Sequence, residues 1–361
     1  SVTGVQTCAL PICPKSYHED NHKCSNCLLF TESSVHITHL PTLRPRQPTS
    51  MTVRPNLTMT YKSTKMDHEY TIISLGLAGN RDIYGINSKG TLLHTALPIE
   101  SPAITSEVGK INIVRNDFAL CTLVPNGLYG IFSGGKEVDI AHLPTMQHVL
   151  RALETKNTPE ESITAVAVCP TNYSKLLIGR NNGSVCEYDT STGYVTKQWP
   201  LSSESTDETS KIVCVGWSGE FPLAMNEHGS MIAGNRIFGI VVDPVSFDTF
   251  NGNVIVVGRN TVALYPKGVW EEHAVWSSVS PIIDAKYSCD GLYIVAVTKE
   301  RCAMLKSSDL TVSTYLQMNS ITDSIGTSGT ANSMAVSPVV PCQVVISFTG
   351  GAIVLIEPTN Y

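Results

Sequence analysis

The sequence predicts an all-β fold, a β-propeller of about seven four-stranded blades, with six or eight blades as alternatives. Three observations lead to this prediction. From Tyr70 onward the chain consists of short apolar runs bounded by Gly, Asn and Pro. These runs recur at a spacing of roughly 41–51 residues, close to the length of one four-stranded blade. Only the segment 150–162 has a helical pattern, and because it is short we expect a loop insertion there.

The clearest copy of the repeated unit spans residues 163–199. Its first strand, 163–170, ends in a proline, which cannot continue a hydrogen-bonded ladder. The second and third strands, 176–179 and 184–189, flank an Asn-Gly pair that is typical of tight hairpin turns. A fourth strand ends at Trp199. This copy therefore predicts one sheet of four antiparallel strands.

Further copies have an apolar opening strand and a strand–turn–strand sequence after it. The opening strands are expected near residues 71, 112, 212, 237, 282 and 331. The interval from 212 to 237 is too short for a whole blade, so either one blade is short or the register is wrong there. A single blade leaves a sheet face uncovered, whereas a ring of blades covers every face. We expect the following side chains to point into blade interfaces: Val166, Val168, Ile240, Val242, Val295 and Val297.

The first 65 residues differ in character from the rest. Residues 2–12, VTGVQTCALPI, match the in-frame translation of a nucleotide string of the sequencing-adapter type. The residues that follow have no apolar period and are rich in Ser, Thr, His and Pro. We therefore expect residues 1–65 to be non-native sequence or a disordered leader, residues 66–361 to form the propeller, and the native start to be Met51, Met59 or Met66.

A cysteine cluster in this leader resembles a zinc motif. Cys24 and Cys27 form a CxxC pair, and Cys8, Cys13, His18 and His22 lie nearby. Four such ligands can hold tetrahedral zinc. However, Cys8 belongs to the adapter match and no second CxxC follows. We interpret the cluster as accidental and expect no metal and no cofactor.

The composition limits the classes of partner. The formal net charge of −6 gives no basic surface for nucleic acid, and no apolar run is long enough to span a membrane. The cysteines after residue 66 are widely spaced and several lie within apolar strands. This usage is typical of buried thiols in a reducing, intracellular compartment.

The repeated pattern resembles that of WD-repeat β-propellers over residues 70–361. Glu187-Tyr188-Asp189 stands where a WD repeat carries Trp-Asp, and SCDGLYIVAV at 288–297 is similar to the common SPDGKYLA turn. No blade ends in Trp-Asp itself, and the Gly-His marks of the family are mostly absent.

A narrower resemblance covers residues 237–358. The order of Leu264-Tyr265, Trp270 and Asp290-Gly291 is similar to the last blades of the N-terminal propeller in the chromosome-transmission-fidelity family of replisome adaptors, the acidic nucleoplasmic DNA-binding proteins. That family's second propeller, trimerising region and HMG-type box have no counterpart before Tyr361. The resemblance implies a nuclear adaptor of DNA replication that binds other proteins.

No catalytic motif accompanies the repeats. There is no GxSxG, P-loop, HExxH or strand-then-helix GxGxxG sequence. We therefore expect a non-enzymatic scaffold that binds other proteins of a multi-subunit complex in the nucleus or cytoplasm. The alternatives are a trafficking or coat-complex subunit, and an enzyme or small-molecule binder that uses the central channel. The candidate protein-interaction residues are Arg180, Arg259, Trp270 and Arg301.

Closure of the ring leaves two alternatives. The strand 352–358 is the third of the last blade, so a fourth strand is missing. Either the segment Lys65–Ile73 supplies it, or the chain continues beyond Tyr361.

Overall fold

The structure, a computed structural model, describes most of the chain after residue 162 and separate segments before it. The described residues are 29–31, 34–36, 58–65, 71–78, 82–87, 91–96, 106–110, 120–123, 129–134, 137–142, 147–150, 162–172, 174–200, 210–233, 236–269, 271–325 and 329–359.

The chain divides into two compact units, Ser1–Val53 and Arg54–Tyr361. The described part of the first unit is a two-stranded antiparallel sheet of β1 (Leu29–Thr31) and β2 (Ser34–His36). The predicted zinc-like cluster around Cys24 and Cys27 lies outside the described residues.

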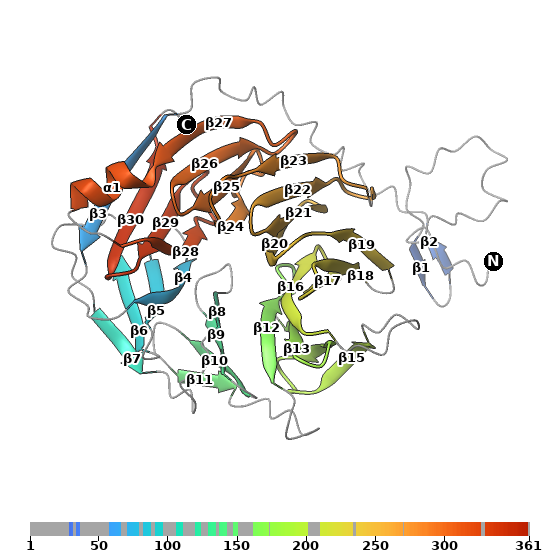
Figure 1. Cartoon of the computed structure of the whole chain (residues 1–361). Coiled ribbons are helices and arrows are strands. Elements are labelled where there is room, and N and C mark those ends of the chain that lie inside the picture. The colour runs from blue at the N-terminus through green and yellow to red at the C-terminus, as the bar shows by residue number, and fades with distance from the viewer. Residues whose placement is uncertain are drawn as a thin grey trace. The chain divides into compact units, whose positions relative to one another are not determined.

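The described part of the second unit consists of seven four-stranded antiparallel sheets and one short helix (Figure 1). The first three sheets contain β4 (Ile72–Ala78), β5 (Asp82–Asn87), β6 (Thr91–Ala96) and β7 (Ser106–Lys110); β8 (Leu120–Leu123), β9 (Tyr129–Gly134), β10 (Glu137–His142) and β11 (Gln147–Leu150); and β12 (Ile163–Val168), β13 (Lys175–Arg180), β14 (Ser184–Asp189) and β15 (Val195–Pro200). The next two contain β16 (Ile212–Ser218), β17 (Phe221–Asn226), β18 (Ser230–Ala233) and β19 (Arg236–Ile240); and β20 (Pro244–Phe250), β21 (Asn253–Gly258), β22 (Thr261–Tyr265) and β23 (Ala274–Ser277). The last two contain β24 (Ile282–Tyr287), β25 (Tyr293–Thr298), β26 (Arg301–Lys306) and β27 (Val312–Gln317); and β28 (Ala331–Val336), β29 (Val344–Phe348), β30 (Ala352–Pro358) and β3 (Met59–Lys65). The predicted all-β class is confirmed.

The sheets of the second unit follow one another in a propeller-like order (Figure 1). The first strand of each sheet contacts the first strand of the next, from β4 through β8, β12, β16, β20 and β24 to β28. Strand β28 in turn contacts β4. The apolar core lies between neighbouring sheets. One cluster, for example, joins Ile255 and Leu264 of one sheet to Ala285 and Ile294 of the next.

Strand β3 comes from a segment that the sequence had assigned to the leader. It pairs with β30 in antiparallel register from Met59 opposite Pro358 to Lys65 opposite Ala352. The predicted domain boundary at residue 66 therefore lies one strand too late. The predicted closing segment Lys65–Ile73 shares only Lys65 with β3, because Ile72 already begins β4.

The prediction of a first strand near residue 237 is wrong. Residues 236–240 are the outer strand β19 of the preceding sheet, and β20 begins only at Pro244. The apolar sequence FGIVVDP resembles an inner strand, but the Val241 amide donates to the Gly229 carbonyl (3.1 Å) and so continues the pairing of β19 with β18. Val242 is consequently 79 % exposed instead of facing a blade interface.

The other predicted interface residues differ in burial. Val295 and Val297 are completely buried, Val166 is buried, and Val168 is half-buried against the same cluster as Val166. The side chain of Ile240 lies outside the described residues.

The described helix α1 (Met318–Ile325) follows β27, at a place where the sequence suggested none. Its Met318 and Ile321 side chains are buried, and the helix contacts β3, β26 and β27. The predicted helical segment 150–162 lies outside the described residues except for its ends, and Leu150 ends β11. Within the described part of the chain, no helix is long and apolar enough to cross a membrane.

Candidate functional site

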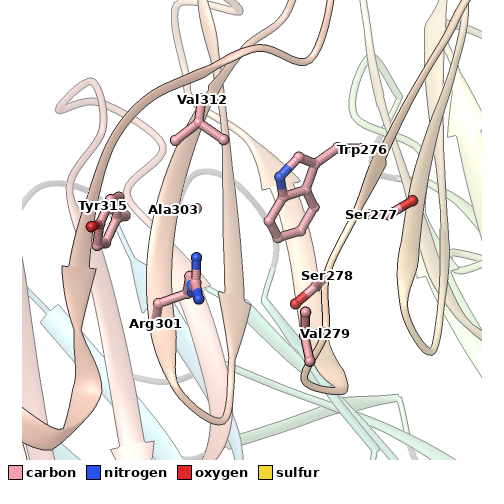
Figure 2. A pocket seen from close by; sticks show the side chains of 8 residues that line it. All are labelled: Trp276, Ser277, Ser278, Val279, Arg301, Ala303, Val312 and Tyr315. Atoms are coloured by element: carbon pink, nitrogen blue, oxygen red, sulfur yellow. The ribbon is translucent and has the colours of Figure 1, made fainter.

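A small pocket opens between the outer strands of two neighbouring sheets (Figure 2). One wall comes from β23 and the residues after it, and the other wall comes from β26 and β27. Its cavity volume is about 90 Å³. The lining residues are Trp276, Ser277, Ser278, Val279, Arg301, Ala303, Val312 and Tyr315.

Two aromatic side chains frame the pocket. Trp276 pairs with the buried Val262 across the sheet and packs its partly buried indole against the core cluster between the two sheets. Tyr315 lies opposite Ala303 on the neighbouring strand and is 53 % exposed. Trp276 is therefore held by the core, whereas Tyr315 is about half exposed to solvent.

Arg301 lies between these aromatic residues (Figure 2). Its guanidinium carbon is 5.5 Å from the centre of the Tyr315 ring, within the range of a cation–π contact. Its backbone is fixed because its amide donates to the Thr298 hydroxyl (3.0 Å) and its carbonyl accepts from the same hydroxyl (3.1 Å). Among the residues that the structure describes, no carboxylate forms an ion pair with Arg301.

The lower rim of the pocket is an ordered turn with an apolar tip. The Asn260 side-chain amide donates to the carbonyls of Ser278 (3.0 Å) and Val279 (3.3 Å), and the Ser278 amide donates to the Asn260 carbonyl (2.8 Å). These bonds fix a turn in which Val279 is 94 % exposed. The turn thus holds an exposed apolar side chain at the pocket that Arg301 also lines (Figure 2).

The pocket's size and side chains limit its chemistry. Sites for cofactors and other small molecules usually measure about 300–1,000 Å³, whereas this one has room for little more than a single side chain. Its lining contains neither a Cys, a His nor a carboxylate. Across the described residues, no group of three His, Cys, Asp or Glu side chains could hold a metal ion.

The remaining predicted interaction residues lie in different surroundings. Arg180, the last residue of β13, is only 3 % exposed; its guanidinium donates to the Tyr188 hydroxyl (2.6 Å) and to Cys186 Sγ (3.6 Å). A surface role for Arg180 does not fit this burial. Arg259 is 63 % exposed and lies 3.9 Å from an Asp243 carboxylate oxygen. Trp270 lies outside the described residues.

A second polar cluster, which the sequence did not predict, links the first strands of two sheets. Lys286 Nζ lies 3.7 Å from Asp284 Oδ2 and donates to the Phe247 carbonyl (3.3 Å). Ser246 donates to Asp284, and the Tyr287 amide donates to Asp248 (2.7 Å). Ser246 and Asp248 lie on β20, which begins seven residues after the first strand that the sequence predicts near residue 237.

The protonation of this cluster does not suit nucleophilic chemistry. Burial lowers the pKa of Lys286, but the charges of Asp284 and Asp248 outweigh burial and leave it above its ordinary value. Burial raises the pKa of Asp248 and that of the neighbouring Cys214 thiol. The amine therefore stays protonated and the thiol stays neutral near pH 7, so neither is activated as a nucleophile.

Six cysteines of the described residues are free thiols, and most of them lie inside the fold. Cys169, Cys186, Cys302 and Cys342 are buried, whereas Cys214 and Cys289 are half-buried. Burial raises the pKa of Cys302 and of Cys342 to about 12. These positions agree with the predicted packing role of the cysteines.

Three of the residues that carried the narrower family resemblance have structural roles, whereas Trp270 lies outside the described residues. Leu264 and Tyr265 are buried in the sheet of β20–β23, and Gly291 occupies a turn with a φ of 70°. Their order along the chain is therefore explained by the fold. No family model matches the chain, and no curated protein matches it either.

Proposed function

We propose that Arg54–Tyr361 is a seven-bladed propeller of the WD-repeat type. The seven four-stranded sheets are its blades, and the contacts between successive first strands line its centre. The pairing of β3 with β30 joins the two ends of the domain in one blade. This pairing supports a closed ring, because a three-stranded last blade would leave an unpaired edge.

On this fold we propose a non-enzymatic scaffold that binds other proteins. The observation that carries the proposal is the pocket between β23 and β27, which Trp276, Arg301 and Tyr315 line and which has an exposed valine at its rim. Trp, Tyr and Arg are the residue types that dominate the binding energy of protein interfaces. Because the surrounding strands and turns already hold these side chains in place, less conformational entropy is lost when a partner binds.

Two more specific roles, replisome adaptor and coat-complex subunit, are both compatible with this proposal, because each would use such a surface. Leu264 and Tyr265, which carried the resemblance to the replisome adaptors, do not favour that role, since both are buried. A ligand in the central channel is not favoured, because the charged groups on β20 and β24 are bonded to one another or to the backbone.

The test is affinity capture from the cells that express the protein, with two matched variants. Val279→Arg places a cation on the rim of the pocket, whereas Val339→Arg places one on another exposed valine, in the turn that follows β28. Val279 precedes a first strand and Val339 follows one, so the two substitutions lie at opposite ends of the strands.

We expect the Val279→Arg variant to lose partners that wild type and Val339→Arg retain, with unchanged melting temperatures. Identical captured sets for all three proteins would overturn the proposal that this pocket is the binding surface.

A further inference from the structure

We propose that the pocket binds an acidic segment of a partner protein, with one apolar side chain of that segment in the cavity and a neighbouring Asp or Glu carboxylate on Arg301. This inference rests on the proposed function and specifies the chemistry of the partner at the same site.

The size of the cavity defines the first half of the ligand. About 90 Å³ accommodates one aliphatic or small aromatic side chain. Trp276, Ala303 and Val312 provide apolar walls, and Val279 stands at the rim. Transfer of one such side chain out of water is favourable, so the cavity selects an apolar anchor.

The polar groups of the lining define the second half. Arg301 is the one charged residue of the lining, and it brings up to five N–H donors. The indole of Trp276 adds another donor, since an indole N–H can only donate. The lining contains no carboxylate that would compete for these donors. A site rich in donors and positive in charge selects an acceptor of negative charge.

The stacking of Arg301 on Tyr315 leaves the guanidinium available to such an acceptor. A cation–π contact at 5.5 Å uses the face of the tyrosine ring and limits the motion of the arginine side chain. It does not use the N–H groups, which form the planar fork that binds a carboxylate at two points. The ring therefore orients the arginine toward a partner.

A second arginine, Arg259, lies next in sequence to the residue that holds the turn of Val279. Arg259 follows β21 directly and Arg301 begins β26, so each lies at the turn that joins the second and third strands of its sheet. Successive sheets place these turns at the same end of the domain. Asn260, next to Arg259, holds the turn of Val279. The pair of Arg259 with Asp243 is long and largely exposed, so it is weak and leaves Arg259 able to exchange partners.

The test uses fluorescein-labelled peptides and the purified full chain. Each peptide carries one Leu or Phe in a Gly-Ser background, next to either two Glu, two Gln or two Lys residues. Fluorescence anisotropy at low and at high salt measures the binding of each peptide to wild type and to the variants Arg301→Gln, Arg301→Lys and Arg259→Gln.

We expect only the Glu peptides to bind. Arg301→Gln should weaken this binding about ten- to hundredfold, the range for a lost charge-assisted hydrogen bond. Arg301→Lys should weaken it less, because the charge remains and the planar fork is lost. Arg259→Gln should mainly reduce the salt dependence, as expected for a rim charge. Thermal melts establish that each variant is folded.

Equal binding of Glu, Gln and Lys peptides, or unchanged affinity in a folded Arg301→Gln variant, would overturn this inference. The proposed function would survive that result if Val279→Arg still lost its cellular partners. Conversely, capture that does not depend on Val279 would overturn the proposed binding surface even if the Glu peptides bind through Arg301.

Discussion

Lys286 is the residue on which the polar contacts between the sheets of β20 and β24 centre. Its side chain is about a third exposed and reaches both Asp284 on its own strand and the Phe247 carbonyl on β20. Asp248 lies close enough for its charge to raise the pKa of Lys286. The ammonium therefore balances two carboxylates that the fold brings together.

Replacing this ammonium by an apolar group should leave the carboxylates uncompensated. We expect Lys286→Met to lower the free energy of unfolding at pH 7 by about 2–3 kcal/mol, less than for a fully buried pair because water reaches the cluster. Urea unfolding measures the change. The control is Lys299→Met, on the exposed turn between β25 and β26, which should change the stability by less than about 0.5 kcal/mol.

The stability lost in the Lys286→Met variant should depend on pH in a defined direction. Burial already raises the pKa of Asp248, and Lys286 lowers it, so the variant raises this pKa further. A carboxyl with a raised pKa in the folded state destabilises the fold fully at a pH above that raised value. The penalty shrinks as the pH falls from the folded pKa toward the unfolded pKa, near 3.9, and is absent below it. The difference in the free energy of unfolding between Lys286→Met and wild type should therefore become smaller as the pH is lowered. A deficit that is constant between pH 7 and pH 4 would contradict this account.

Two features of the fold require glycine at position 291: its backbone conformation and the nearby ring of Phe250. Its φ of 70° lies in the left-handed region, and a Cβ atom there would come within 2.0 Å of the Phe250 ring. We expect Gly291→Ala to destabilise the protein by about 2–4 kcal/mol in urea unfolding, from backbone strain and the clash together.

Gly268 provides the matched comparison. Its φ is 75°, but a Cβ atom at this position would have no heavy atom within 4 Å beyond its chain neighbours. Gly268→Ala should therefore cost only the backbone strain, about 1 kcal/mol. Equal losses for the two substitutions would mean that Phe250 moves aside freely.

Single residues also show where prediction from the sequence fails. Arg180 and Arg301 occupy similar turn positions, yet one is buried against Tyr188 and the other stacks on the exposed Tyr315. The burial of an arginine depends on what the neighbouring sheet places over it, and this is a long-range property. The pocket beside Trp276 could not be predicted from local sequence, because residues of the next sheet complete it.

At the scale of elements, the strands and hairpins were the most predictable part. The strand 184–189 was predicted at its observed bounds, because an Asn-Gly turn and alternating polarity are local signals. Strand β19 was misassigned, because FGIVVDP is as apolar as a first strand and only its partner β18 shows its place. Strand β3 was missed, since an outer strand with the sequence MTYKSTK has no apolar run.

Helix α1 supports the strand that completes the last sheet. It contacts β3, β26 and β27, and its Ile321 side chain is completely buried. We expect Ile321→Ala to destabilise the protein by about 2–4 kcal/mol, from lost burial and the resulting cavity.

Proteolysis should show where this effect acts. If α1 holds β3 in place, Ile321→Ala should make the chain around Lys62 and Lys65 more sensitive to trypsin before global unfolding. Asp323→Ala, an exposed position of the same helix, is the control and should change neither property. Faster cleavage that is spread evenly over the chain would contradict a local role.

At the scale of the whole molecule, the feature to test is the N-terminal boundary of the folded unit. The unit from Arg54 to Tyr361 contains every strand of the seven sheets, whereas a start at Met66 removes β3. We expect a chain that starts at Arg54 to melt at the temperature of the full chain. A chain that starts at Met66 should melt several degrees lower and form oligomers, because the edge of β30 is then exposed.

Calorimetry gives the melting temperature of the full chain and of the chains that start at Arg54 and Met66, and light scattering gives their oligomeric state. If the chain from Met66 remains a monomer with an unchanged melting temperature, β3 does not stabilise the domain. A lower melting temperature for the chain from Arg54 would show that residues before it contribute to stability.

The pairing of β3 with β30 also has a consequence for synthesis on the ribosome. The Thr359 hydroxyl donates to the Thr58 carbonyl across a sequence separation of 301 residues. At a translation rate of about 5–20 residues per second, β3 leaves the exit tunnel about 15–60 s before its partner strand does. During that interval β3 of each nascent chain is unpaired, and so is β3 of the neighbouring chains on the same messenger RNA. Exchange of β3 between such chains would give intertwined dimers, so dilution of the nascent chains or a chaperone that shields β3 would favour the monomer.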